Sequence, residues 1–168
     1  MKAWRYCAVL APFAAGAALA AAAPSAYDLA GRYTHSFENG DISGARFTST
    51  DRVVVIPLDR NRAYFGVQLN FFNGHQCAIG GTAAIEGRAL VYRDPDVRGV
   101  GDASRCTFRI WREGRSLRWS DGEATCTRYC GARGSLRSGR MDWASRRPIP
   151  RAERARLLRE YERVRDLP

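Results

Sequence analysis

Five dipeptides in which Asn, Asp or Glu precedes Gly are spaced along the chain, and these turn signals constrain its fold more than any other sequence feature. Asn-Gly and Asp-Gly favour two-residue hairpins, because both central positions of such turns need positive φ. The segments between the dipeptides are therefore expected to be strands that reverse direction at each turn. The five dipeptides are Asn39-Gly40, Asn73-Gly74, Glu86-Gly87, Glu113-Gly114 and Asp121-Gly122.

The segments between these turns have the composition and alternation of β-strands. Residues 53–56 form a β-branched run, residues 89–92 a second apolar run, and small residues at 78–84 suit a crowded or sharply bent strand. About eight or nine such strands predict a mainly β fold, an antiparallel up-and-down meander closed into a small barrel or a sandwich. The clearest alternation places Ala63, Phe65, Val67, Leu69 and Phe71 on one face.

The hairpin around Glu113-Gly114 allows a prediction of strand register. A two-residue loop at this dipeptide places Phe108 opposite Trp119 and Ile110 opposite Leu117, so that one face is apolar. Arg109 then lies directly opposite Arg118 on the other face. That polar face is expected to carry Arg105, Thr107, Arg109, Trp111, Arg118 and Ser120.

Residues 1–22 have the pattern of an export signal. Lys2 and Arg5 precede an alanine-rich apolar run over residues 7–23, and small residues follow it, so cleavage is expected between about residues 20 and 26. A retained membrane anchor is the alternative, since the run approaches the roughly 17–25 residues that a span needs. The pattern predicts a periplasmic or secreted protein.

The remaining chain divides into a β domain over residues 27–147 and a C-terminal helical segment over residues 148–168. Residues 94–104 are rich in Gly and Asp and are predicted to be a mobile loop. A helix is expected from about Arg151 to Arg165, and we favour its packing on the body of the protein over binding to an anionic membrane. Its apolar stripe comprises Ala155, Leu157, Leu158, Tyr161 and Val164.

Four of the five cysteines follow the signal, and an even number in an exported domain predicts two disulfides. Three connectivities are allowed. We expect Cys77–Cys130 with Cys106–Cys126, because a Cys126–Cys130 bridge would need a tight turn. A four-thiolate zinc site is the alternative, but paired C-x-x-C knuckles are missing and an oxidising compartment disfavours thiolates. No metal or cofactor is expected.

Arginine supplies almost all of the basic charge, and it gathers in the second half of the chain. Residues 23–104 have a net charge of −1, whereas residues 105–168 have a net charge of +9. Arginine is suited to bidentate contacts with carboxylate and phosphate groups. The cluster of Arg105, Arg109, Trp111 and Arg118 is therefore a candidate site for an anionic component of the cell envelope or a protein partner. Solvated surface charge is the alternative interpretation.

Catalysis and nucleic-acid binding are disfavoured by what the chain lacks. Lys2 is the only lysine, so the mature protein has no Schiff-base or P-loop lysine. The G-x-S-x-G motif is missing, and His35 and His75 are the only histidines. An exported chain with no recognisable nucleic-acid motif is not expected to bind DNA or RNA. The sequence thus predicts a binding protein rather than an enzyme.

The run Ser43-Gly44-Ala45-Arg46-Phe47 resembles the Ser-Gly-x-x-Tyr signature of the bacterial C-type lysozyme inhibitors. Phe47 takes the place of the tyrosine, and the second, lysine-containing motif of that family has no counterpart here. The resemblance implies a small exported barrel that inserts this loop, with Ser43 and Arg46, into the lysozyme cleft. Two further runs, residues 73–77 and 129–134, resemble uncharacterised exported proteobacterial proteins, some of them labelled lysozyme-inhibitor-like.

Overall fold

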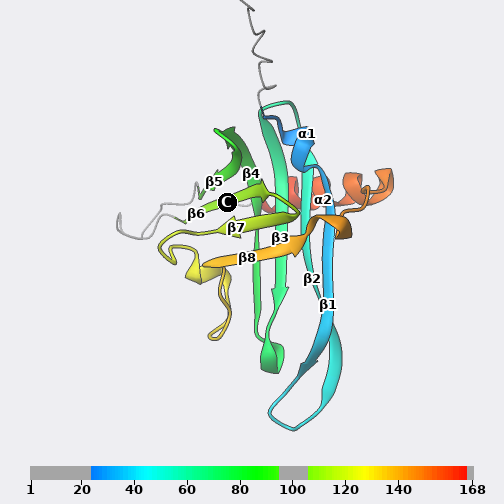
Figure 1. Cartoon of the computed structure of the whole chain (residues 1–168), viewed down its shortest axis with the longest axis vertical. Coiled ribbons are helices and arrows are strands. Elements are labelled where there is room, and N and C mark those ends of the chain that lie inside the picture. Colours follow the sequence, from blue (N-terminus) through cyan, green and yellow to red (C-terminus); the bar gives the residue numbers. More distant parts are fainter. Residues whose placement is uncertain (1–23, 95–105, 166–168) are drawn as a thin grey trace, which may run out of the picture.

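The computed structural model describes residues 24–94 and 106–165, with side chains as far as Arg163. Each strand pairs antiparallel with the next one along the chain, in the order β1 to β8 (Figure 1), which confirms the predicted mainly β meander. The strands are β1 (Gly31–Gly40), β2 (Arg46–Pro57), β3 (Arg62–Asn70), β4 (Gln76–Glu86), β5 (Ala89–Arg93), β6 (Thr107–Glu113), β7 (Ser116–Ser120) and β8 (Ser138–Asp142). The helices are α1 (Ala26–Leu29) and α2 (Arg151–Arg165), and short 3-10 turns are η1 (Phe72–Gly74), η3 (Thr127–Tyr129) and η4 (Trp143–Ser145).

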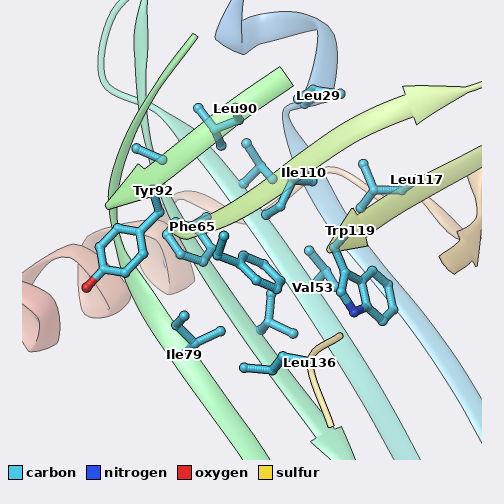
Figure 2. Close-up of a cluster of buried hydrophobic side chains, with 14 of the residues drawn as sticks. Leu29, Val53, Phe65, Ile79, Leu90, Tyr92, Ile110, Leu117, Trp119 and Leu136 are labelled. Atoms are coloured by element: carbon cyan, nitrogen blue, oxygen red, sulfur yellow. The ribbon is translucent and has the colours of Figure 1, made fainter. Parts of the chain in front are cut away.

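The sheet curls into a nearly closed barrel whose interior is filled by apolar side chains (Figure 2). The alternation predicted for β3 places Phe65 in the centre, with its ring centroid 5.8 Å from that of Phe108 and 5.2 Å from that of Tyr92. Gly81 lies opposite Phe65, and a Cβ there would stand only 2.5 Å from the Tyr92 ring. The small residues of β4 thus make room for this aromatic cluster.

The barrel closes between its first and last elements through a short contact. Arg32 at the start of β1 and Arg147 after β8 exchange two backbone hydrogen bonds of 2.9 and 2.8 Å. At the same end, Ala26 and Leu29 of α1 are buried against the core, and the Ala26 amide donates to the Arg60 carbonyl at 2.8 Å. The two chain segments that flank the sheet therefore complete its core.

Both predicted disulfides are present, Cys77–Cys130 and Cys106–Cys126. They attach the long connection between β7 and β8 to β4 and to the residue before β6. Leu136, in the same connection, is 1 % exposed and packs into the core (Figure 2). An irregular segment of the chain is thereby made part of the rigid body of the barrel.

The register predicted for the β6–β7 hairpin is wrong by two residues. The loop consists of Gly114 and Arg115, so Ile110 lies opposite Trp119, and Arg109 lies opposite Ser120 instead of Arg118. Gly114 has φ of +56° and takes the first central position of the turn, where a type II′ turn needs glycine. A shift of two residues keeps each side chain on its expected face, so the apolar and polar faces are as predicted.

The turn predicted at Asn39-Gly40 is also displaced. Both residues belong to β1, which pairs with β2 as far as Gly40 opposite Arg46, and the connection is the five-residue loop 41–45. Positive φ occurs at Gly44 instead of Gly40. Because residues 46–51 of β2 pair with β1 but not with β3, the end of this hairpin projects from the barrel as a two-stranded ribbon (Figure 1).

Helix α2 spans the residues predicted for it and lies across the convex side of the sheet (Figure 1). Near its start, Arg154 donates to the Pro57 carbonyl at 2.9 Å, and near its end Tyr161 contacts Tyr64 with ring centroids 5.1 Å apart. Leu157 and Leu158 are half-buried, but Ala155 of the predicted stripe is exposed, because the face of α2 toward the sheet runs through Arg154, Leu157 and Tyr161.

The predicted export signal and residues 95–104 of the predicted loop lie outside the described residues, as does Arg105. Within residues 24–94 and 106–165, none of the helices has the length and apolar character to cross a membrane.

Candidate functional site

The arginine face predicted from the sequence lies on the convex side of β6–β8, with a different set of neighbours. Arg118 of β7 is directly opposite Trp111 of β6 on one side and directly opposite Arg140 of β8 on the other. Arg109 lies one step further along β6, diagonal to Arg118. We call Arg109, Trp111, Arg118 and Arg140 the arginine face.

Arg140 is the member of this face that sequence reasoning missed. The short strand around it has no turn dipeptide beside it, and its apolar content is limited to Met141. Its alternation, with Met141 inward and Arg140 outward, is the only signal that could have identified it. Two arginines do oppose each other across a strand pair, as the sequence suggested, but the pair is Arg118 with Arg140.

The charges on the arginine face are only partly compensated by nearby carboxylates. Arg118 forms an ion pair with Glu113, whereas Arg109 and Arg140 form no ion pair among the described residues. Next to the face, hydrogen bonds from Arg93 hold the pKa of the Glu86 carboxyl below its ordinary value, with a smaller contribution from the charge of Arg109. The face therefore retains a net positive charge with exposed guanidinium groups.

Other arginines of the second half have structural roles. The guanidinium groups of Arg112 and Arg146 lie 4.3 and 4.9 Å from the ring centroid of Trp143, which in turn contacts the buried Tyr33. Such contacts are cation–π interactions. Burial raises the pKa of Tyr33 to about 12. These arginines cover the end of the core. The excess positive charge of the second half therefore comes partly from arginines with a structural role and partly from the exposed arginines of the arginine face.

The second predicted site, Ser43 and Arg46, lies at the tip of the projecting ribbon. Ser43 belongs to the loop before β2, where the Asp41 carboxylate accepts hydrogen bonds from the Ser43 hydroxyl at 2.5 Å and the Ser43 amide at 2.8 Å. These hydrogen bonds lower the pKa of the Asp41 carboxyl, and the bond from the Ser43 hydroxyl has the largest effect. Arg46 begins β2 and forms an ion pair with Glu38 at 2.5 Å.

The ribbon tip also exposes large apolar side chains. Ile42 is 82 % exposed, Phe47 is 41 % exposed, and Phe72 of the neighbouring η1 turn is 49 % exposed. The structure does not bring the tip and the arginine face together: they lie on different strands in separate parts of the molecule (Figure 1). They are two candidate surfaces, not one site.

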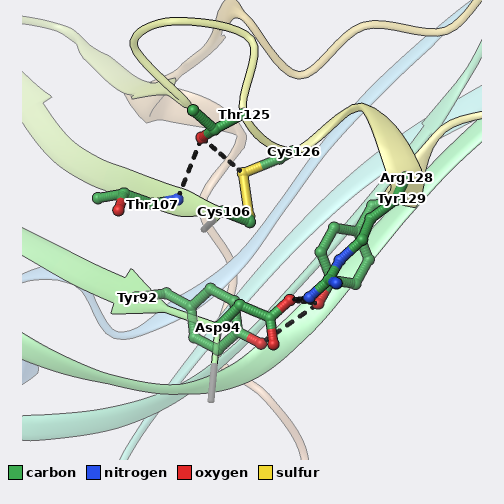
Figure 3. Close-up of polar contacts among 8 residues, drawn as sticks. All are labelled: Tyr92, Asp94, Cys106, Thr107, Thr125, Cys126, Arg128 and Tyr129. Atoms are coloured by element: carbon green, nitrogen blue, oxygen red, sulfur yellow. Dashed lines mark hydrogen bonds and ion pairs between the residues drawn. A yellow bond between two sulfur atoms is a disulfide. The ribbon is translucent and has the colours of Figure 1, made fainter. Parts of the chain in front are cut away.

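A buried polar cluster that sequence reasoning missed lies where β5 ends (Figure 3). The Asp94 side chain is 3 % exposed and forms an ion pair with Arg128. It accepts a hydrogen bond from the Tyr129 hydroxyl, which lies 3.5 Å from the Tyr92 hydroxyl. The Asp94 amide donates to the carbonyl of Cys106 at 3.0 Å.

This cluster has a structural role: it fixes the end of β5 to the connection between β7 and β8. Arg128 and Tyr129 lie between two disulfide cysteines, Cys126 and Cys130, which hold them against Asp94. Burial raises the pKa of the Tyr92 hydroxyl, which therefore stays protonated at neutral pH. The carboxylate of Asp94 is neutralised by Arg128 and cannot act as an exposed acid. The prediction that Asp94 belongs to a mobile loop is wrong, because Arg128 and Tyr129, more than thirty residues away in sequence, hold its side chain in a buried position.

The histidines do not form a site together. His35 is on β1, where it stacks on Phe37 with ring centroids 5.6 Å apart, and His75 follows η1, with β2 and β3 between them. Among the residues that the structure describes, three or more His, Cys, Asp or Glu side chains do not converge in a way that could hold a metal ion.

Comparisons with family models, with curated proteins and with solved structures find no match for this chain.

Proposed function

We propose that this protein is a non-catalytic binding protein whose arginine face recognises an acidic polymer of the cell envelope. The observation that carries the proposal is the direct opposition of Arg118 and Arg140 across the β7–β8 pair. Like charges directly opposite each other on a sheet are destabilising, and an anionic ligand would relieve their repulsion. Guanidinium groups bind carboxylates and phosphates in bidentate geometry, and half-buried Trp111 offers a flat surface beside them.

Two disulfides support a site of action outside the cytoplasm, because such bonds persist in oxidising compartments. If the N-terminal segment is an export signal, its cleavage must leave α1 intact. Ser25 and Asp28 form a capping box around the α1 start, and Ala26 is fully buried. We therefore expect Ser25 to be retained in the mature chain, which N-terminal sequencing of the exported protein can check.

The test of the arginine face uses polygalacturonate, a carboxylated polysaccharide, with neutral dextran as the comparison polymer. Binding should fall as ionic strength rises, and each of Arg118→Thr and Arg140→Thr should weaken it about tenfold, the worth of one charged hydrogen bond. Arg60→Thr is the matched control, because Arg60 is an exposed arginine in the β2–β3 connection. Neither face variant should change the free energy of unfolding by more than about 0.5 kcal/mol.

Binding that is equal for both polymers, or that is insensitive to salt and to both face variants, would show that these arginines are ordinary solvated charge. Arg118→Thr and Arg140→Thr should not alter any activity of the ribbon tip, because the tip and the arginine face are separate surfaces.

A second function, inhibition of a lysozyme by the ribbon tip, is favoured by one observation. The run that resembles the inhibitor signature forms an exposed loop at the end of a projecting hairpin, a shape that can enter a cleft. The tip carries Glu38, Asp41 and Arg46, so it lacks the strong positive charge that would oppose binding to a basic lysozyme. An assay of C-type lysozyme with the protein and its Ser43→Ala and Ile42→Ser variants tests this function, and full lysozyme activity at excess protein would reject it.

A further inference from the structure

A groove lies between α2 and the convex face of β2–β4, away from both candidate surfaces. Its volume is about 320 Å³, within the range of small-ligand sites. Val54, Tyr64 and Ala78 of the sheet form one wall, and Leu157 of α2 forms the other. Arg52 and Gln68, directly opposite each other on β2 and β3, stand at one end.

Two glycines reduce the side-chain volume of the sheet on the groove side. The register aligns Val54 with Gly66 and Gly66 with Gly80 in one row across three strands. The Tyr64 hydroxyl lies against these glycines, since a Cβ on Gly66 would be 3.3 Å from it and a Cβ on Gly80 would be 3.5 Å from it. The two glycines therefore admit the Tyr64 hydroxyl close to the sheet, and they add no side chain of their own to the floor of the groove.

Helix α2 spans this groove without filling it. Its contacts with the sheet are concentrated at Arg154 near one end and Tyr161 near the other, where the Tyr161 hydroxyl is 3.1 Å from the Thr82 hydroxyl. Leu157, between these two contacts, lines the groove and remains half-buried. Apolar surface of the helix is thus left available to a ligand.

The polar groups of the groove are arranged for a single negative charge at one end. Arg52 forms no ion pair among the described residues, whereas the acid in the lining, Glu153, is held by Arg32 at 2.8 Å. Gln68 offers an amide donor beside Arg52. Burial raises the pKa of Tyr64, so its hydroxyl remains a donor at neutral pH. A cation without a counter-ion therefore stands at the end of an apolar channel.

We propose that this groove binds a fatty acid, with the acyl chain between Leu157 and the sheet and the carboxylate on Arg52 and Gln68. The acyl chain of the ligand would cover the half-buried surface of Leu157. Its carboxylate would supply the counter-ion that Arg52 lacks among the described residues. The ligand is a free fatty acid, because one guanidinium matches one carboxylate and the groove has room for a single chain.

Isothermal titration of the mature protein with laurate, below its micellar concentration, tests the proposal. One laurate should bind per chain, and each methylene added between hexanoate and laurate should tighten binding about three- to fourfold, the worth of a buried methylene. Methyl laurate, which lacks the charge, should bind at least tenfold more weakly.

Two variants test the charged contact and the space in the groove, since Arg52, Gln68 and Ala78 lie in one row across β2, β3 and β4. Arg52→Gln should weaken laurate binding about tenfold and make laurate and methyl laurate nearly equal. Ala78→Phe should abolish binding by filling the groove, and exposed Ala78 can be enlarged without disturbing the core. Arg60→Gln is the matched control and should leave binding unchanged. Circular dichroism with a thermal melt checks that each variant is folded.

Binding with several laurates per chain, binding only above the micellar concentration or only to vesicles, or no response to Arg52→Gln and Ala78→Phe in folded protein would each overturn the proposal. Arg140→Thr should not affect laurate binding. The groove and the arginine face therefore succeed or fail independently.

Discussion

The barrel body and the projecting ribbon of β1 and β2 are both antiparallel sheet, yet different forces hold them together. In the body, side chains such as Phe65 and Phe108 are fully buried, and two disulfides attach the irregular segments to the strands. In the ribbon, Phe47 and Ile42 stay exposed, and the strands pair only with each other. A two-stranded hairpin alone is marginally stable in water.

Polar side chains replace the missing neighbours of the ribbon. The Asn39 side-chain amide donates to the Ser49 hydroxyl at 3.0 Å and to the Phe71 carbonyl at 3.1 Å. The Asp51 carboxylate accepts from the Asn70 amide at 2.7 Å. The ribbon is thus tied to the end of β3 by hydrogen bonds in place of apolar burial. This protein therefore concentrates its stability in the barrel body and leaves an exposed hairpin of lower local stability, and binding elements are usually found in such regions.

The largest expected effect comes from matched phenylalanine truncations in the two regions. Phe65→Ala should lower the free energy of unfolding by about 3–5 kcal/mol, because it leaves a cavity in a filled core. Phe47→Ala should lower it by less than about 1 kcal/mol, because that ring is 41 % exposed. Urea denaturation followed by tryptophan fluorescence measures both values. Equal costs at the two positions would mean that the ribbon is as tightly packed as the body.

Removal of the disulfides should weaken the body and leave the ribbon unchanged. The Cys77–Cys130 bridge spans 53 residues and the Cys106–Cys126 bridge spans 20. Loop-closure entropy then predicts losses of about 4 and about 3 kcal/mol for the two paired Cys→Ser replacements. Urea denaturation of each double variant gives the order, and a larger cost for the shorter bridge contradicts the entropic account.

Loss of the Asn39 hydrogen bonds should lower the local stability of the ribbon, with a smaller effect than the two changes above, and leave the barrel body unchanged. Asn39→Ala removes two anchoring bonds, and a cost of about 1–2 kcal/mol should appear as a 5- to 30-fold faster exchange of ribbon amides. Native-state hydrogen exchange resolves the ribbon from the body, whose protection should not change. Asn61→Ala, at an exposed position whose side chain makes no hydrogen bond among the described residues, is the control. Uniform loss of protection would show that ribbon and body unfold as one unit.

The smallest effect concerns the loop at the ribbon tip in acid. The folded-state pKa of Asp41 is lowered, so its stabilisation of the loop is present above the unfolded value of about 4 and is lost as pH falls through the lowered value. Ser43→Ala removes the hydrogen bond that lowers this pKa most, and the pKa should then rise toward its ordinary value. An NMR titration of the Asp41 carboxyl measures the change, with Ser36→Ala as the control. An unaltered titration in Ser43→Ala would contradict the geometry of the loop.

Features governed by neighbours along the chain were predictable from the sequence. The inward face of β3, the helix from Arg151 to Arg165 and the division of β6 into apolar and polar faces all follow from local periodicity. For the disulfides, the local argument against a Cys126–Cys130 bridge excluded one of three connectivities, and the structure distinguishes the remaining two. The turn at Gly114 was located correctly to within one residue, but one residue moves the register by two.

The β meander, its two faces and the place of the C-terminal helix could be predicted from the amino-acid sequence, because hydrophobic periodicity and turn chemistry act over a few residues. Three features depend on packing: Arg118 lies opposite Arg140, Asp94 is paired with Arg128, and Gly66 lies opposite Gly80 in the groove lined by Leu157. Each of these contacts joins residues far apart in the chain. Their formation depends on register and on the closure of the barrel, which are properties of the whole packed sheet and not of any one segment.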